Sequence, residues 1–240
     1  MQAYQSRIAE NLVEVNREID RALDRAGRAG EKISLVVVTK GQPYVKIQTA
    51  AALGLQNFGE NYIEEAREKM NLLRGLPSVS WHFIGHLQSR KVTLLGNQFG
   101  LIHSLDRQKF ATKLETYLAA SGRNQAVLLQ VNVSGEPEKS GFPAWLPEHE
   151  AQLFESVEKI SDCRHVVIHG LMTIPPFHQN PEHARPYFRR LRELRERLKA
   201  RFPGTDWETL SMGMSLDYRV AIEEGANMIR LGQVILGPRS

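Results

Sequence analysis

The chain has 240 residues, 42% of them hydrophobic and 24% charged, and a formal net charge of +4. This length suits one large core as well as two small domains, and the charge is too weak to indicate nucleic-acid binding by itself. A single cysteine, Cys163, excludes a disulfide framework and fits a reducing compartment. No apolar run approaches the ~20 residues of a membrane helix and no signal-peptide pattern opens the chain, so we expect a cytoplasmic protein.

The first half of the sequence alternates helix and strand patterns. Apolar residues at three- and four-residue steps predict an N-terminal helix that stops near Gly27 and Gly30 and covers the N-terminal end of the fold. The run at 34–40, SLVVVTK, is typical of a strand buried on both faces, and Lys40 stands where that strand leaves the core. Strands are also predicted at 56–59, 81–85 and 101–105, and helices at 45–53, 60–73, from about 88 and at 107–120, with Asp106 as an N-cap.

The second half repeats the same alternation. Strands are predicted at 126–133, 165–173, 209–213 and 227–231, and helices at 147–160, 181–201 and 216–224. Eight strands alternating with helices indicate the α/β class and a single (β/α)8 TIM barrel over residues 1–240, with residues 1–30 as an extra helix. An open, doubly wound sheet is the competing arrangement.

Polar residues follow the predicted strands, at the end of such a barrel where ligands bind. This rim holds one prominent amine, Lys40, and no set of residues typical of a metal site. The candidates after the successive strands are Lys40, Asn61, Tyr62, His86, Gln88, Ser104, Asp106, residues 134–141, Met172, Thr173, Met214, Ser215 and residues 230–233.

The segment after the eighth strand, GQVILG from Gly232 to Gly237, is short enough for one helical turn. The loops after strands seven and eight form a recurrent phosphate site in these barrels, to which Ser215 would add a hydroxyl and Arg230 a fixed charge. The alternative is that the glycines only close the barrel and that Arg230 pairs with an acid such as Glu223. Lys40 likewise has an alternative role as an ordinary solvated lysine.

An amine, a phosphate cup and an arginine between them indicate a phosphorylated aldehyde held as a Schiff base. Attack on a carbonyl requires the pKa of Lys40 to fall from its ordinary ~10.4, through burial or a nearby cation. Pyridoxal phosphate fits, because it has the aldehyde, the phosphate and a ring nitrogen that needs a partner. Arg230 in that position cannot accept the ring N–H, so it would favour an unprotonated ring and a weaker electron sink.

A series of motifs follows in order from about residue 34 to the C-terminus: VVVTK, NFGENYIEEAREK, WHFIGHLQSRK, IHSLDR, LLQVNVSGEPEKSGF, HGLMTIPP and LSMGMSLDYRVAIEEGANMIRLGQVILGPR. Together they resemble the pyridoxal phosphate homeostasis protein family, the YggS and PROSC group. The segments LQSRK and SLDY resemble those of the cyanobacterial branch of that family.

The resemblance implies a single (β/α)8 barrel of the fold-type III class, related to the N-terminal domain of alanine racemase. Lys40 falls on the family's Schiff-base lysine, and Arg230 falls on the arginine that faces the pyridine nitrogen. The phosphate cup and its surroundings would comprise Ser215 with the backbone of Gly232 and Gln233, and then Met214, Asn61 and Ser211.

The resemblance also implies a carrier or regulator of vitamin B6 and amino-acid balance, without established turnover. Alanine racemase has a second domain whose tyrosine is the opposite-face base, and we expect no such domain here. Tyr62 is the nearest substitute. A pyridoxal phosphate enzyme with relaxed specificity, such as a racemase or lyase, is the alternative. We expect a monomer that passes pyridoxal phosphate to apoenzymes and binds neither nucleic acid nor membrane.

Residues 184–201 form a strongly basic helix pattern above an apolar stripe that contains Tyr187, Leu191, Leu194 and Leu198. The favoured interpretation is a solvated face that the stripe docks on the barrel. A surface that binds RNA or an acidic protein is the sharper alternative. Cys163 is interpreted as a packing or surface residue and not as a nucleophile.

Overall fold

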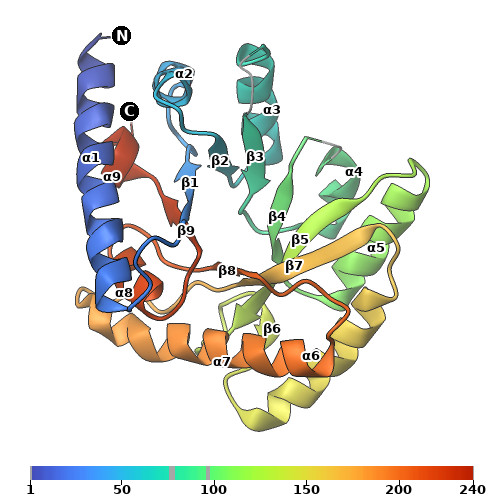
Figure 1. Cartoon of the computed structure of the whole chain (residues 1–240). Coiled ribbons are helices and arrows are strands. Elements are labelled where there is room, and N and C mark those ends of the chain that lie inside the picture. Colours follow the sequence, from blue (N-terminus) through green and yellow to red (C-terminus); the bar gives the residue numbers. More distant parts are fainter. Residues whose placement is uncertain (1, 76–78, 96–97, 240) are drawn as a thin grey trace.

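The computed structural model describes residues 2–75, 79–95 and 98–239 and contains a closed parallel β-barrel (Figure 1). Each of the eight predicted barrel strands is confirmed, with bounds that differ by a few residues at most. The barrel strands are β1 (Ser34–Val38), β2 (Asn57–Glu60), β3 (Ser80–Phe83), β4 (Leu101–Leu105), β5 (Gln125–Asn132), β7 (Val166–Met172), β8 (Thr209–Ser211) and β9 (Met228–Leu231).

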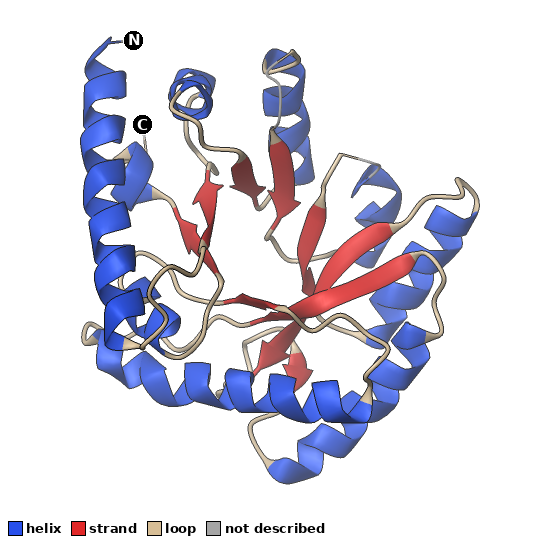
Figure 2. Ribbon diagram, in the orientation of Figure 1, coloured by secondary structure: helices blue, strands red, loops and turns tan. Residues whose placement is uncertain are grey.

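Helices surround these strands on the outside (Figure 2). The α-helices are α1 (Gln2–Arg25), α2 (Tyr44–Ala52), α3 (Ile63–Leu72), α4 (Val92–Leu95), α5 (Gln108–Ala119), α6 (Pro147–Ser161), α7 (Arg185–Arg201), α8 (Tyr218–Glu223) and α9 (Gln233–Leu236). Short 3-10 helices η1 (Ser89–Lys91) and η2 (Pro181–Ala184) precede α4 and α7, and a two-residue strand β6 (Phe142–Pro143) pairs with β5.

The strand order β4-β3-β2-β1-β9-β8-β7-β5 is closed by a parallel pairing of β4 with β5. This closure rules out the open, doubly wound sheet. On β1 and β9 the register places Val36 beside Arg230, so both side chains lie on the same level of the barrel. The carboxyl ends of all eight strands therefore meet at one rim, where the candidate residues of the sequence lie.

The N-terminal helix α1 does not cover the end of the barrel, so that part of the prediction is wrong. Its apolar face, which includes the buried residues Ile8, Val15 and Leu23, packs along the side of the barrel against α2, α8 and α9. The helix after β9 is a single turn, and it leaves the flank between α8 and α2 to be covered by α1. The predicted N-cap is also wrong, because Arg107 holds the cap position of α5 and the Asp106 carboxylate bonds Arg107 Nη1 at 2.8 Å instead.

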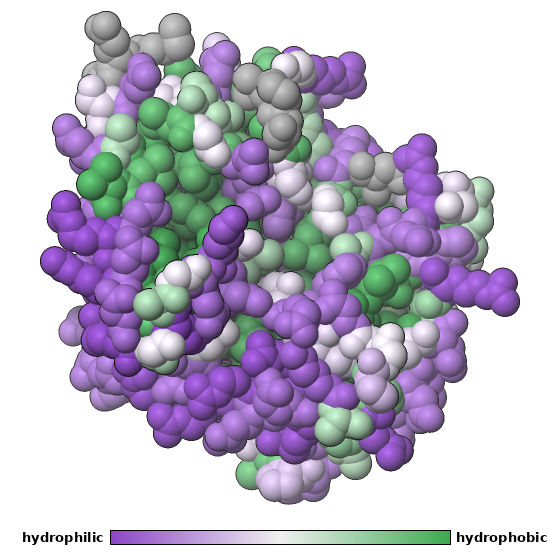
Figure 3. Space-filling model, in the orientation of Figure 1, coloured by the Kyte–Doolittle hydropathy of each residue, from purple (hydrophilic) through white to green (hydrophobic). Residues whose placement is uncertain are grey.

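Helix α7 docks on the barrel through its apolar stripe, as the favoured interpretation predicted. Leu191, Leu194 and Leu198 are fully buried and Tyr187 is half-buried. The opposite face is polar, and purple hydrophilic side chains cover most of the lower left of Figure 3, over α7. Among the described helices none is long and apolar enough to cross a membrane.

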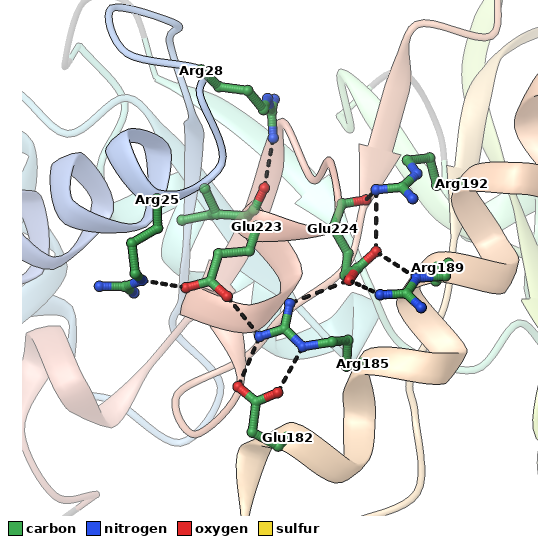
Figure 4. Close-up of polar contacts among 9 residues, drawn as sticks. Arg25, Arg28, Glu182, Arg185, Arg189, Arg192, Glu223 and Glu224 are labelled. Carbon is green, nitrogen blue, oxygen red and sulfur yellow. Dashed lines mark hydrogen bonds and ion pairs between the residues drawn. The ribbon is translucent and has the colours of Figure 1, made fainter.

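An ion-pair network joins α1, α7 and α8 (Figure 4). Its charged members are Arg25, Glu182, Arg185, Arg189, Arg192, Glu223 and Glu224. Arg28 adds a hydrogen bond from its Nη1 to the backbone oxygen of Ile222 at 2.7 Å. Arg185 is the centre, because its guanidinium lies 2.6 Å from both Glu182 and Glu223 and 3.2 Å from Glu224. Much of the positive charge of the basic helix is thus neutralised within the fold, which favours a structural role for these arginines.

Candidate functional site

A cavity of about 200 Å³ lies at the carboxyl ends of the strands around β1 and β9. Seven of the eight residues predicted from the sequence line it, namely Lys40, Asn61, Met214, Ser215, Arg230, Gly232 and Gln233. Four further residues complete the wall, namely Val38, Ile84, Ile174 and Arg239. The barrel closure thus brings together residues that are up to 193 positions apart, from Lys40 to Gln233.

Lys40 follows β1, and its side chain faces the cavity, whereas the preceding Thr39 faces the helix layer and bonds Glu60 Oε1 at 2.6 Å. Burial of the half-buried amine lowers the pKa of Lys40 below its ordinary value, and the positive charge of Arg239 lowers it further. Glu60 and Glu65 oppose this shift in pKa only in part. The interpretation of Lys40 as a freely solvated lysine is therefore wrong, and the shift in its pKa is in the direction that favours nucleophilic attack.

A buried lysine of α3 fixes the turn that carries Lys40. Lys69 Nζ donates to Glu60 Oε1 and to Glu65 Oε1, each at 2.6 Å. Glu65 Oε1 in turn accepts the backbone N–H of Gly41 at 2.7 Å. Gly41 has φ 65°, a conformation that favours glycine, so the turn after β1 depends on both this residue and the carboxylate that binds it.

Arg230 of β9 lines the cavity and is 4% exposed. Its Nη1 donates to Ser211 Oγ at 2.6 Å and its Nη2 donates to the carbonyl oxygen of Thr173 at 3.0 Å. Burial lowers the pKa of Arg230 to about 10, and the negative charge of Asp217 opposes that shift. The alternative partner Glu223 is wrong, because Glu223 pairs with arginines of α1 and α7 on the outside of the barrel.

Ser211 differs from the other predicted site residues, since it lies fully buried beneath the cavity and holds Arg230. Ser211 is therefore not part of the cavity lining, and it would act on a bound cofactor only through the guanidinium of Arg230.

The predicted helical turn after β9 is confirmed as α9, which begins at Gln233. A Cβ on Gly232 would lie 3.2 Å from the carbonyl oxygen of Val38, so a residue without a side chain allows β9 and β1 to meet at this point. In α9 the N–H groups of Ile235 and Leu236 donate to the carbonyl oxygen of Gly232, which leaves those of Gln233 and Val234 without an acceptor in the helix and suited to an anion. Ser215 lines the cavity beside them, and Asp217 shapes its loop by accepting the N–H of Met214 at 2.7 Å.

The C-terminal tail contributes a third cation to the cavity, which the sequence did not predict. Gln42 Nε2 donates to the carbonyl oxygen of Gly237 at 2.9 Å, and Lys46 Nζ donates to that of Pro238 at 2.8 Å. These bonds hold the tail over the turn after β1, and Arg239 therefore lines the cavity near Lys40. The signal in the sequence was the position of Arg239 two residues after Gly237, which closes the glycine-bounded turn.

Two more cavities, of about 230 and 270 Å³, adjoin the first across the barrel mouth. Asn61 lines all three, and its buried Oδ1 atom has no hydrogen-bond partner within the described part of the chain. His86 lines both additional cavities, Tyr62 and Gln88 line the smaller one, and residues 138–140 line the larger. Of the remaining candidates, Ser104, Asp106 and Thr173 are buried below the rim.

The donor set of the first cavity fits an anionic aldehyde. Lys40, Arg230 and Arg239 place three cationic side chains around it, and the orphaned oxygen of Asn61 requires a donor that a ligand hydroxyl would supply. The helical turn and Ser215 offer neutral donors for a phosphate group. Within the described residues no cluster of histidine, cysteine and carboxylate side chains is arranged to hold a metal ion.

Comparison with known proteins gives a family match over nearly the whole chain. The family model for the alanine racemase N-terminal domain matches residues 11–240. The pyridoxal phosphate homeostasis protein of Aquifex aeolicus is 41% identical over 230 residues, which cover 96% of this chain and 97% of that protein. The protein of the same name from Pseudomonas aeruginosa is 41% identical over 234 residues, which cover 98% of this chain and 96% of that one.

A solved structure shows the same fold at a lower identity. PipY of Synechococcus elongatus, in the structure with pyridoxal phosphate bound, superposes with a TM-score of 0.82. It is 32% identical, and the match covers 96% of this chain and 100% of PipY.

Proposed function

The chain belongs to the pyridoxal phosphate homeostasis protein family, and on that premise we propose that it binds pyridoxal 5'-phosphate in the cavity around Lys40 and serves intracellular vitamin B6 homeostasis and amino-acid balance. The observation that carries the proposal is the half-buried amine of Lys40, whose pKa is lowered and which shares one cavity with Arg230 and the start of α9. The bound cofactor of PipY supports the same assignment.

Each residue of the cavity has a distinct role in this proposal. Lys40 Nζ forms the Schiff base with the cofactor aldehyde, because its lowered pKa leaves more of the amine unprotonated at neutral pH. Arg230 faces the ring nitrogen, and Ser215 with the backbone of Gly232 and Gln233 holds the phosphate. Asn61 accepts a hydrogen bond from the cofactor, and Met214 packs beside it.

These roles favour a carrier over an enzyme. The cofactor supplies an electron-withdrawing ring when it is bound, but a guanidinium at the ring nitrogen has no acceptor and keeps that nitrogen unprotonated. Racemisation by two bases also needs a second side chain over the substrate carbon. Tyr62 is 63% exposed and lines the neighbouring cavity, so it is a poor second base. A racemase or lyase of relaxed specificity is the second candidate.

Absorption spectroscopy with added pyridoxal phosphate tests this function. We expect a visible band with the wild type and with Lys109→Ala, which removes an exposed lysine of α5, and none with Lys40→Ala. A wild type that stays colourless would refute cofactor binding. Incubation of the loaded protein with a panel of amino acids then separates a carrier from an enzyme, because sustained product formation that is lost in Lys40→Ala would favour the second candidate.

We also propose that the protein acts as a monomer in the cytoplasm and passes its cofactor to apoenzymes. Size-exclusion chromatography with light scattering gives the oligomeric state directly. Transfer is tested by mixing the loaded protein with an apo pyridoxal phosphate enzyme while a competing lysine-rich peptide traps free cofactor. Enzyme activation that survives the trap supports direct transfer, and activation that the trap abolishes argues against it.

A further inference from the structure

A line of four buried polar side chains crosses the barrel interior, starting at Arg230. Arg230 Nη1 lies 2.6 Å from Ser211 Oγ, and His103 Nδ1 lies 2.9 Å from the same oxygen. His82 Nδ1 lies 2.9 Å from His103 Nε2. The four residues come from β9, β8, β4 and β3, so the line runs from one wall of the barrel to another, and each of them is 5% exposed or less.

The chemistry of the groups gives this line a direction. A guanidinium has only donors, so Ser211 Oγ must accept from Arg230. The hydroxyl hydrogen of the fully buried Ser211 is then satisfied by His103 Nδ1 as acceptor. That choice puts the ring proton of His103 on Nε2, from which it donates to Nδ1 of His82. Each of the three hydrogen bonds along the line then has one donor and one acceptor, as buried polar groups require.

Both histidines are neutral near pH 7 in this position. Burial lowers the pKa of His82 to about 4, and burial with the neighbouring charge of Arg230 lowers the pKa of His103 well below its usual range. Asp217 is the carboxylate that acts on Arg230, and burial raises the pKa of Asp217 although its bond to Met214 and the charge of Arg230 oppose that shift. A neutral His103 can accept from Ser211, whereas an imidazolium could not.

We propose that His103, supported by His82, is a positioning residue that orients Arg230 toward the cofactor through Ser211. The inference rests on the proposed function, because Arg230 has a ring nitrogen to face only when the cofactor binds. Holding the Ser211 hydroxyl hydrogen on His103 keeps a lone pair of Ser211 Oγ directed at Arg230 Nη1. Ser211 and the carbonyl oxygen of Thr173 together fix the plane of the guanidinium, and its remaining N–H groups stay available to the cavity.

A double-mutant cycle on the full chain tests the proposal. His103→Leu removes the acceptor at similar volume, His103→Gln keeps a side-chain oxygen that can accept, and Ser211→Ala removes the link to Arg230. For each variant and for the double variant we would measure pyridoxal phosphate affinity by fluorescence quenching and the pH dependence of the absorption spectrum of the bound cofactor. Thermal unfolding of each protein without cofactor reports whether it folds.

We expect His103→Leu and Ser211→Ala each to weaken affinity by roughly tenfold, since a hydrogen bond to a charged group is disturbed. Both should shift the spectral pH profile, because ring protonation becomes easier when Arg230 is misaligned. His103→Gln should recover most of the affinity, and His103→Leu should have no further effect in the Ser211→Ala background.

The proposal is overturned if His103→Leu keeps the wild-type profile, or if its effect is equally large without Ser211, which would indicate a packing role. If His103→Leu does not fold, the small change Ser211→Ala decides, and a wild-type affinity and spectrum in that variant would refute the proposal. Failure of the wild type to bind pyridoxal phosphate would refute the proposed function instead, so the two failures are distinguishable.

Discussion

Two arginines of this barrel have opposite surroundings. Arg185, on the outside, bonds three glutamates, and these bonds raise its pKa above the ordinary value. Arg230, in the interior, bonds a serine hydroxyl and a backbone carbonyl, and burial lowers its pKa to about 10. The charge of Arg185 is neutralised by its glutamate partners, whereas the direct partners of Arg230 are uncharged and leave its positive charge available.

The difference separates structural from functional cations in a basic protein. Carboxylates of Glu182, Glu223 and Glu224 hold the arginines of the ion-pair network, which pins α7 to α8 and α1. At the cavity, Lys40, Arg230 and Arg239 all belong to the lining, and no carboxylate is among the described lining residues. Like charges that are close together destabilise the folded protein, and a bound anion relieves that repulsion.

Substitution of each arginine by leucine gives the largest expected contrast. Arg230→Leu should weaken pyridoxal phosphate binding by about 100-fold, because a charge-assisted contact is lost, and change the free energy of unfolding by less than about 1 kcal/mol, since a desolvated charge is removed with its bonds. Affinity titration and urea unfolding measure the two effects. Strong binding with Arg230→Leu would show that this arginine does not face the cofactor.

The buried His82 in the barrel interior should make the free energy of unfolding depend on pH. Because the pKa of His82 is lowered to about 4, the unfolded state takes up its proton first as the pH falls, and stability is lost between about pH 6.5 and about pH 4. From about pH 7.5 to about pH 5 the expected loss from this residue is about 2 kcal/mol. Urea unfolding at both pH values should show a correspondingly smaller loss in His82→Phe. An equal loss in the variant would contradict the neutral assignment.

Substitution in the ion-pair network should lower stability slightly and leave cofactor affinity unchanged, which is the reverse of the result expected for Arg230→Leu. Arg185→Leu should lower the free energy of unfolding by about 1 kcal/mol, because Glu224 keeps Arg189 and Arg192 as partners and the network is partly exposed. Pyridoxal phosphate affinity should stay unchanged, since Arg185 lies outside the cavity. Urea unfolding with a parallel binding titration checks both statements. A loss of affinity comparable to that of Arg230→Leu would erase the distinction between the two regions.

The smallest expected effect concerns the tail. Arg239→Ala removes a nearby positive charge and should raise the pKa of Lys40, while burial, the larger cause, continues to lower it. The rate of reaction with pyridoxal phosphate, measured against pH, should therefore shift to higher pH. The shift should shrink in high salt, because Arg239 is exposed. A profile identical to that of the wild type would assign the lowered pKa to burial alone.

Most of the fold could be predicted from local pattern. The valine-rich run at 34–38 and the alternation of strands with helices lead directly to a parallel barrel, because each strand is buried on both faces. The position of α1 could not be predicted, since it depends on the shortness of α9, which leaves a flank of the barrel uncovered. The cap of α5 could not be predicted either, because Asp106 has a stronger partner in Arg107 than in the backbone.

The site divides in the same way. Lys40, Ser215 and the turn after β9 follow strand ends and carry recognisable spacing, so the sequence places them at the rim. The supporting groups have no such signal. His82 and His103 lie within strands and not at their ends, and their link to Arg230 exists only after the barrel closes. Arg239 reaches the cavity through side chains of the turn after β1 and α2, which no local pattern reveals.

Borohydride reduction of the protein loaded with pyridoxal phosphate, followed by peptide mapping, tests the central claim most directly. The account predicts a single pyridoxyl group on Lys40, because that lysine lines the cavity and has a pKa lowered by burial. A label on another lysine, or a wild type that takes up no label while it binds the cofactor, would contradict the account of the site.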